Sequence, residues 1–187
     1  MRNVNVPKMF FILNAIDAIG IGLILMIAFL LQFVLNELPC PLCILQRIGL
    51  LGIAFGFLLN IRFRAHPAHY TLSLLAAILT GFVAMRQILL HITPGSGSYG
   101  EALFGMHLYT WTFILSVAAI LYISIILAVL SQYLHSVTEN KVRHRLAHIA
   151  FGLIIGLALA NAVSTYLECG FAACSDNPVS YLILQHS

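Results

Sequence analysis

Charged residues are scarce in this chain: only 8% of its 187 residues are Asp, Glu, Lys or Arg, whereas 61% are hydrophobic. A soluble domain of this size carries roughly a quarter charged residues. The low charge therefore excludes a soluble globular protein, and no basic patch of the kind that binds nucleic acid is present. Long apolar runs stand in place of the missing charge. They predict an integral membrane protein whose residues 1–187 form one domain.

Five apolar segments are long enough to cross a bilayer, which takes about 20 residues each. They lie at about residues 9–35, 42–61, 70–92, 108–134 and 146–167. An isolated apolar segment in lipid must satisfy its own backbone hydrogen bonds, so we expect an all-α bundle of five transmembrane helices. The first run is too long for a signal-peptide core and no small-residue cleavage site follows it. We therefore expect it to be retained as the first helix.

Lysine and arginine are missing from the connectors at 36–41 and 93–107 and from the tail at 168–187. Seven of the nine lie in the N-terminal residues or in the connectors at 62–67 and 136–145. By the positive-inside rule, this pattern predicts a cytoplasmic N-terminus and a C-terminus on the outside. Both cysteine pairs then lie on the non-cytoplasmic face.

The four cysteines form two close pairs, Cys40 with Cys43 and Cys169 with Cys174, which suits an oxidising compartment. The Cys-Pro-Leu-Cys element at 40–43 begins the second helix, where the helix N-terminus lowers a thiol pKa and favours a redox-active pair. A structural disulfide or half of a zinc site are the alternatives. The Cys169–Cys174 pair is either a second shuttle disulfide or a static bridge that pins the tail.

Three further residues are candidate ligands of a polar-headed, lipid-soluble electron acceptor. Arg47 lies four residues after Cys43, on the same helix face, and Gln46 lies beside Cys43. Arg47 is on the side that otherwise lacks cations, which argues against a simple snorkelling anchor. His91 ends the third span at about the depth of Cys43 and offers a hydrogen bond to a quinone carbonyl. Its alternative is an interfacial histidine that faces water.

The other polar residues receive no functional role. His144 and His148 have helical spacing, but they lie in a basic connector and fit a solvated face, so no metal site is predicted. Asp17 near the inner end of the first span fits an interfacial position. Arg86 needs a partner that the sequence does not identify. Residues 99, 109 and 111 are aromatic and fit an outer aromatic belt.

These residues together resemble the disulfide bond formation protein B (DsbB) family of bacterial inner-membrane thiol oxidoreductases. The resemblance rests on Cys-Pro-Leu-Cys-x-x-Gln-Arg at 40–47, Arg86-Gln87-x-x-Leu90-His91, Pro94-Gly95 and His107-Leu108-Tyr109-Thr110-Trp111, and it covers the first four helices. It implies reoxidation of a periplasmic thioredoxin-fold dithiol oxidase, with electrons passed to ubiquinone or menaquinone. Cys43 and Arg47 would face the quinone, and Cys40 would exchange with the second cysteine pair.

The chain departs from the family pattern, which has four helices and a second cysteine pair between helices 3 and 4. Here the connector at 93–107 has no cysteine, and the second pair follows a fifth helix. Which of Cys169 and Cys174 meets the partner therefore stays open. Two other functions are considered. A vitamin K epoxide reductase-like enzyme is disfavoured because Gln46 and Arg47 follow the early pair, and a membrane haem or metal carrier would use the eight histidines.

Overall fold

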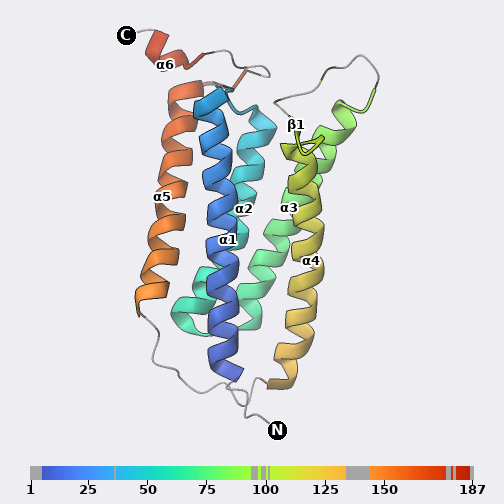
Figure 1. Cartoon of the computed structure of the whole chain (residues 1–187), viewed down its shortest axis with the longest axis vertical. Helices are drawn as coiled ribbons and strands as arrows, with labels where there is room; N and C mark the ends of the chain where they lie inside the picture. The colour runs from blue at the N-terminus through green and yellow to red at the C-terminus, as the bar shows by residue number, and fades with distance from the viewer. Residues whose placement is uncertain are drawn as a thin grey trace.

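The computed structural model describes residues 6–35, 37–93, 97, 100, 102–133, 144–175, 178 and 180–185. Five long helices make up most of this part of the chain: α1 Val6–Leu35, α2 Pro41–Phe63, α3 Pro67–Leu90, α4 Leu108–Tyr133 and α5 His144–Cys169 (Figure 1). Each contains a span long and apolar enough to cross a membrane. The prediction of an all-α membrane bundle of five helices is confirmed, while the side on which each terminus lies stays a prediction.

The helix bounds differ from the predicted ones because caps and prolines set them. Pro41 and Pro67 occupy the first turns of α2 and α3, where a missing backbone N–H costs nothing. His66 caps α3, its Nδ1 accepting from the N–H of Ala68 at 3.2 Å, so this helix begins three residues before the predicted start. Helix α5 runs two residues beyond the predicted end at 167, so Cys169 is its last residue rather than part of the tail.

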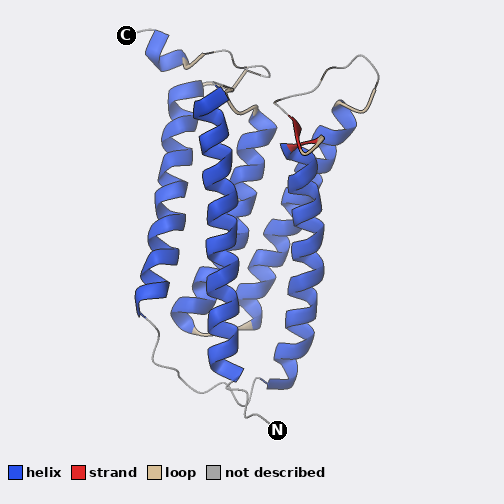
Figure 2. Cartoon of the chain, viewed as in Figure 1, coloured by secondary structure: helices blue, strands red, loops and turns tan. Residues whose placement is uncertain are grey.

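Three small elements were not anticipated. Strands β1 (Ala102–Leu103) and β2 (Met106–His107) form an antiparallel hairpin before α4, and α6 (Leu182–Gln185) is a single turn in the tail (Figure 2). Phe104 and Gly105 form the hairpin turn with φ of 54° and 80°, the backbone conformation of a tight two-residue turn. Pro94-Gly95, part of the family resemblance, and Tyr99, part of the predicted aromatic belt, lie outside the described residues.

Helix α2 is the centre of the bundle and packs against α1, α3 and α5, while α4 packs on α3. Small residues bring α2 and α3 close together: Gly49, Gly52 and Gly56 face Thr80, Ala76 and Ser73. A Cβ built on Gly52 would lie 3.1 Å from the Cβ of Ala76. This close approach holds the middle parts of α2 and α3 together.

Buried polar side chains tie the helices together at the opposite end. The amide of Asn14 on α1 donates to Tyr70 Oη on α3 at 2.6 Å and accepts from Asn60 Nδ2 on α2 at 2.9 Å. Asp17 on α1 accepts from Tyr122 Oη on α4 at 2.7 Å. These bonds give Asp17 a role in packing.

Candidate redox site

Both cysteine pairs lie at one end of the bundle, where α1 and α5 end and α2 begins; we call it the cysteine end (Figure 1). Cys40 and Cys43 form a disulfide with a Cα–Cα distance of 5.0 Å. Cys40 is also the N-cap of α2, and its Sγ accepts from the N–H of Cys43 at 3.1 Å. When this disulfide is opened, the same N–H and the helix dipole stabilise a thiolate.

Gln87 is a site residue that the sequence reasoning did not single out as one. It is 1% exposed, and its Nε2 lies 3.3 Å from Cys40 Sγ and 3.5 Å from Cys43 Sγ. Gln46, also buried, donates from Nε2 to Gln87 Oε1 at 2.6 Å. Gln46 is thus linked to the disulfide by its hydrogen bond to Gln87, and its predicted role in binding the electron acceptor stays a prediction. An amide side chain in an otherwise apolar span, four residues before His91, was the signal that the sequence offered.

Arg47 is buried and turned into the protein. It is 8% exposed, and its guanidinium donates to Gln32 Oε1 at 2.7 Å and to the carbonyl of Ala28 at 3.2 Å. The guanidinium carbon lies 4.7 Å from the centre of the Phe29 ring. A snorkelling side chain would instead extend to the membrane surface, so that alternative does not describe its position.

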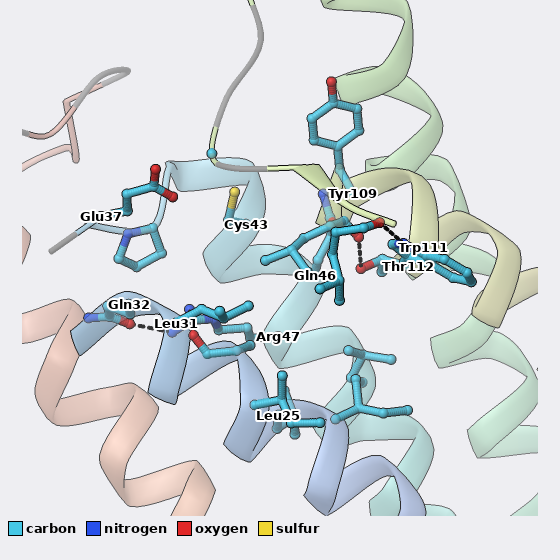
Figure 3. Close-up of a pocket in the computed structure, with 18 of the residues that line it drawn as sticks. Leu25, Leu31, Gln32, Glu37, Cys43, Gln46, Arg47, Tyr109, Trp111 and Thr112 are labelled. Carbon is cyan, nitrogen blue, oxygen red and sulfur yellow. Dashed lines mark hydrogen bonds between the residues drawn. The ribbon is translucent and has the colours of Figure 1, made fainter. Parts of the chain in front are cut away.

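Cys43, Gln46 and Arg47 line one cavity of about 340 Å³ (Figure 3). Apolar side chains from α1, α2 and α4 form most of its wall, including Leu25, Leu50 and Leu115. Its polar lining also includes Gln32, Glu37, Tyr109, Trp111 and Thr112. Trp111 Nε1 is bonded to the carbonyl of Leu103 and Thr112 Oγ1 to that of Leu108, so these two donors are already used. The cavity therefore has a largely apolar wall that also presents a sulfur, an amide and a cation.

His91 does not line this cavity. Its Nδ1 lies 2.8 Å from the carbonyl oxygen of Gln87, and since a carbonyl only accepts, this nitrogen carries a proton. The ring stacks on Tyr109, whose side chain does line the cavity, at a centroid distance of 5.6 Å. The quinone-binding role of His91 stays a prediction, and the contact observed orients Tyr109 instead. Arg86 is exposed on the outer face of α3.

The second cysteine pair is also a disulfide, with a Cα–Cα distance of 4.8 Å. Cys169 is 4% exposed, whereas Cys174 is partly exposed. Gly170 ends the helix with φ of 61°, and its N–H donates to the carbonyl of Tyr166 at 2.8 Å. Phe171, inside the small loop, is 98% exposed. The pair therefore has one sulfur on the bundle side and one nearer the surface.

A buried polar cluster, absent from the sequence-based interpretation, joins Arg47 to this tail. Gln32 accepts from Arg47 and donates from Nε2 to Ser164 Oγ and to Tyr181 Oη, each at 3.0 Å. Glu168, 2% exposed, lies close enough to Arg47 for the two charges to interact. We call Gln32, Arg47, Ser164, Glu168 and Tyr181 the tail cluster. It connects α1, α2, α5 and the residues after the second disulfide.

No group of three metal-ligating side chains is close enough to hold a metal ion within the part of the chain that the structure describes. His66 and His69 instead meet the α2–α3 corner: His69 Nδ1 lies 3.0 Å from Asn60 Oδ1, and the backbone N–H of His66 donates to the same oxygen. The side chain of His144 lies outside the described residues.

Comparison with known proteins agrees with the resemblance. Residues 10–99 match the family model described as "Disulfide bond formation protein DsbB". A curated protein named Disulfide bond formation protein B, from Verminephrobacter eiseniae (strain EF01-2), is 42% identical over 80 residues, which are 41% of this chain and 45% of that protein. The chain thus spans about half the length of the curated relative it matches. No solved structure matches the chain.

The matched residues include the first disulfide with Gln46, Arg47, Gln87 and His91, and they end before α4. Helix α5 and the second disulfide lie beyond the match. Residues 10–99, which hold the Cys-Pro-Leu-Cys element and the three helices around it, are thus similar to the DsbB family of disulfide bond formation proteins.

Proposed function

We propose that this chain generates disulfides in a bacterial inner membrane, using a membrane quinone to reoxidise a periplasmic thioredoxin-fold dithiol oxidase. One observation carries the proposal: Cys43 of a disulfide and the cation Arg47 line the same largely apolar cavity. The match of residues 10–99 to the DsbB family model supports a membrane protein that makes disulfides. The cavity is where we expect the electrons to leave the protein.

The residues present fit a quinone, whether ubiquinone or menaquinone. A quinone has an apolar ring and two carbonyl acceptors, so it needs an apolar wall and a few donors. Arg47 has five N–H groups, and its two observed bonds leave others for a ligand. Gln46 likewise keeps its second amide N–H, because only one is given to Gln87. A quinone bound there would accept two electrons and two protons.

The two disulfides would act in series. A thiolate of the reduced partner attacks the Cys169–Cys174 disulfide and forms a mixed disulfide with one tail cysteine. The partner's second thiol then displaces that tail cysteine, which leaves a dithiol in the tail and a disulfide in the partner. The tail dithiol then reduces the Cys40–Cys43 disulfide by the same exchange. Each stage moves two electrons. After the second stage this electron pair is on Cys43, which lines the same cavity as Arg47. Gln87 and the first turn of α2 stabilise the thiolates formed there.

The partner side of the reaction requires both disulfides on the periplasmic face. Their common position at the cysteine end supports this, because a single orientation of the bundle exposes both pairs to one compartment. The placement of the lysines and arginines supports the periplasm as that compartment.

The proposal is tested with the full chain purified in detergent. Organic extracts of the protein are assayed for bound quinone, and quinone absorbance is followed after adding a reduced thioredoxin-fold dithiol protein. We expect stoichiometric bound quinone and its reduction, with one disulfide formed in the partner per quinone reduced. Protein that oxidises the dithiol without consuming quinone would contradict the proposal.

A further inference from the structure

Glu168 has an unusual environment for a carboxyl group. It is 2% exposed, and neither of its oxygens has a hydrogen-bond partner among the residues that the structure describes. Burying a carboxylate without hydrogen bonds is costly, and such a group in a native protein needs an explanation. A carboxylate in this setting can take up a proton without breaking a hydrogen bond.

The groups around Glu168 belong to both redox centres. Arg47 of α2 interacts with its charge, and the same guanidinium lines the cavity with Cys43. Tyr181 from the tail also interacts electrostatically with Arg47. On α5 itself the next residue is Cys169, a buried member of the second disulfide. Gln32 of α1 is neutral and is already bonded to Arg47, Ser164 and Tyr181.

We propose that Glu168 takes up the proton that the tail dithiol releases when it reduces the Cys40–Cys43 disulfide. This inference rests on the proposed function, in which electrons pass from the tail pair to the first pair. It adds a catalytic acid–base group on α5, beyond the residues that match the family model.

The step balances as follows. A tail thiol gives its proton to the Glu168 carboxylate, and the sulfur attacks Cys40. An S–S bond forms to Cys40, the Cys40–Cys43 bond breaks, and its electron pair stays on Cys43 as a thiolate. The second tail thiol then displaces Cys40 from the mixed disulfide and gives its proton to the Cys40 sulfur. This closes the tail disulfide and leaves a Cys40 thiol and a Cys43 thiolate, with the other proton on Glu168. We assign the first attack to Cys169 because it and Cys40 are the buried members of their pairs, at 4% and 5% exposed.

The physical reason for this role is that the net charge around Arg47 stays the same during the step. Before the step, Arg47 is balanced by the Glu168 carboxylate. After it, Arg47 is balanced by the Cys43 thiolate four residues away, and Glu168 is neutral. In a poorly polarisable site, two anions sharing one cation, or a cation left alone, would be strongly disfavoured. Moving the proton to Glu168 as the thiolate forms keeps the local charge constant.

The test measures electron transfer between the two pairs in quinone-depleted full-length protein. Reduced thioredoxin is the electron source; samples are quenched with acid, alkylated and analysed by peptide mass spectrometry for free thiols at 40 and 43. The variant lacking both tail cysteines measures the direct reduction of Cys40–Cys43 by thioredoxin, and this background rate is subtracted. We expect Glu168→Gln to slow the transfer on the order of 100-fold at pH 7, the lower end for a positioned general base. Glu168→Asp, which keeps a carboxyl, should recover most of the rate.

Asp17→Asn is the matched control, an acid-to-amide change in α1 at the far end of the bundle, and should transfer at the wild-type rate. A second readout uses the background without tail cysteines and with Cys40–Cys43 reduced. There, Glu168→Gln should shift the alkylation of Cys43 to lower pH, because Arg47 is no longer shared with a carboxylate. Purely structural damage would not lower that pH.

Two results would overturn the inference. Wild-type transfer rates in Glu168→Gln would show that no proton passes through this carboxyl, and an unchanged Cys43 titration would show that its charge does not reach Arg47. Failure of the wild-type protein to pass electrons between the pairs is a different result, and it would remove the proposed route itself.

Discussion

Gln46 determines which way the amide of Gln87 points. Its Nε2 donates to Gln87 Oε1 at 2.6 Å, so the Gln87 Nε2 is left to face both sulfurs of the Cys40–Cys43 disulfide. Both side chains are buried, on different helices, in a largely apolar setting. An N–H held in this way makes only a weak hydrogen bond to a neutral disulfide sulfur and a stronger one to a charged thiolate. The relationship therefore favours the opened, reduced state.

Replacing Gln87 with Leu should raise the pH at which the reduced Cys40 and Cys43 thiols react with an alkylating agent. A hydrogen bond to a charged group contributes about 1.5–3 kcal/mol, so we expect about a 10- to 100-fold smaller thiolate population. Gln46→Leu should have a smaller effect in the same direction and add little to Gln87→Leu, since it acts through Gln87. Leu89→Ala, at an exposed position on the same helix, is the control. Full additivity of the two Gln changes would contradict the inference that Gln46 acts through Gln87.

Replacing Arg47 with Gln should raise the Michaelis constant for quinone by about tenfold or more, because a charge-assisted bond to the ligand is lost. Steady-state quinone reduction, with a small dithiol as the electron source, gives this value. Arg47→Lys should restore only part of the affinity, since an ammonium cannot bond Gln32, Ala28 and a ligand in the same planar geometry. An unchanged Michaelis constant in Arg47→Gln would remove this residue from the binding site.

Changing both tail cysteines to Ser should abolish turnover with the protein dithiol and spare quinone reduction driven by a small dithiol that reduces Cys40–Cys43 directly. The single changes should trap mixed disulfides, which non-reducing electrophoresis detects. Because Cys174 is the more exposed sulfur, we expect the variant that keeps Cys174 to trap the partner. Wild-type oxidation of the partner by the double variant would make the tail disulfide a static bridge.

Reporter fusions should place residue 65 and the C-terminal end on opposite sides of the membrane, with residue 65 in the cytoplasm. The distribution of lysines and arginines sets this expectation. Alkaline phosphatase, active only outside, and a cytoplasmically active reporter are compared at both sites. A C-terminal end in the cytoplasm would place the tail disulfide away from the periplasm and exclude the proposed partner.

Gly56→Val should lower the thermal stability of the detergent-solubilised protein. A Cβ at this position would lie 2.5 Å from the carbonyl oxygen of His69 and 3.1 Å from the backbone nitrogen of Ser73. Overpacking of this kind typically costs about 1–3 kcal/mol, and the clash is with backbone that cannot rotate away. Gly152→Val on α5 is the matched control, since a Cβ added there would meet nothing within 4 Å. Equal melting temperatures for the two variants would contradict the close α2–α3 contact.

The sequence alone determined the five spans, because the length and hydropathy of a segment decide by themselves whether it can cross a bilayer. It also determined that Cys43 and Arg47 share a helix face, since that relation is local to one helix. The pairing of cysteines close in sequence followed for the same reason, and both disulfides are present. The end of α5 was misplaced by two residues because the charged Glu168 interrupts the apolar run, yet Glu168 and Cys169 are both buried.

The tertiary structure decided which polar groups meet between helices. Gln87 on α3, Gln32 on α1 and Glu168 on α5 come from helices that are apolar on nearly every side, so their sequences do not reveal which side faces the protein and which faces lipid. That rotation is set by packing, such as the glycine face of α2 against α3. It brings Gln87 to the first disulfide and joins Arg47 to the tail, two relationships that exist only between helices.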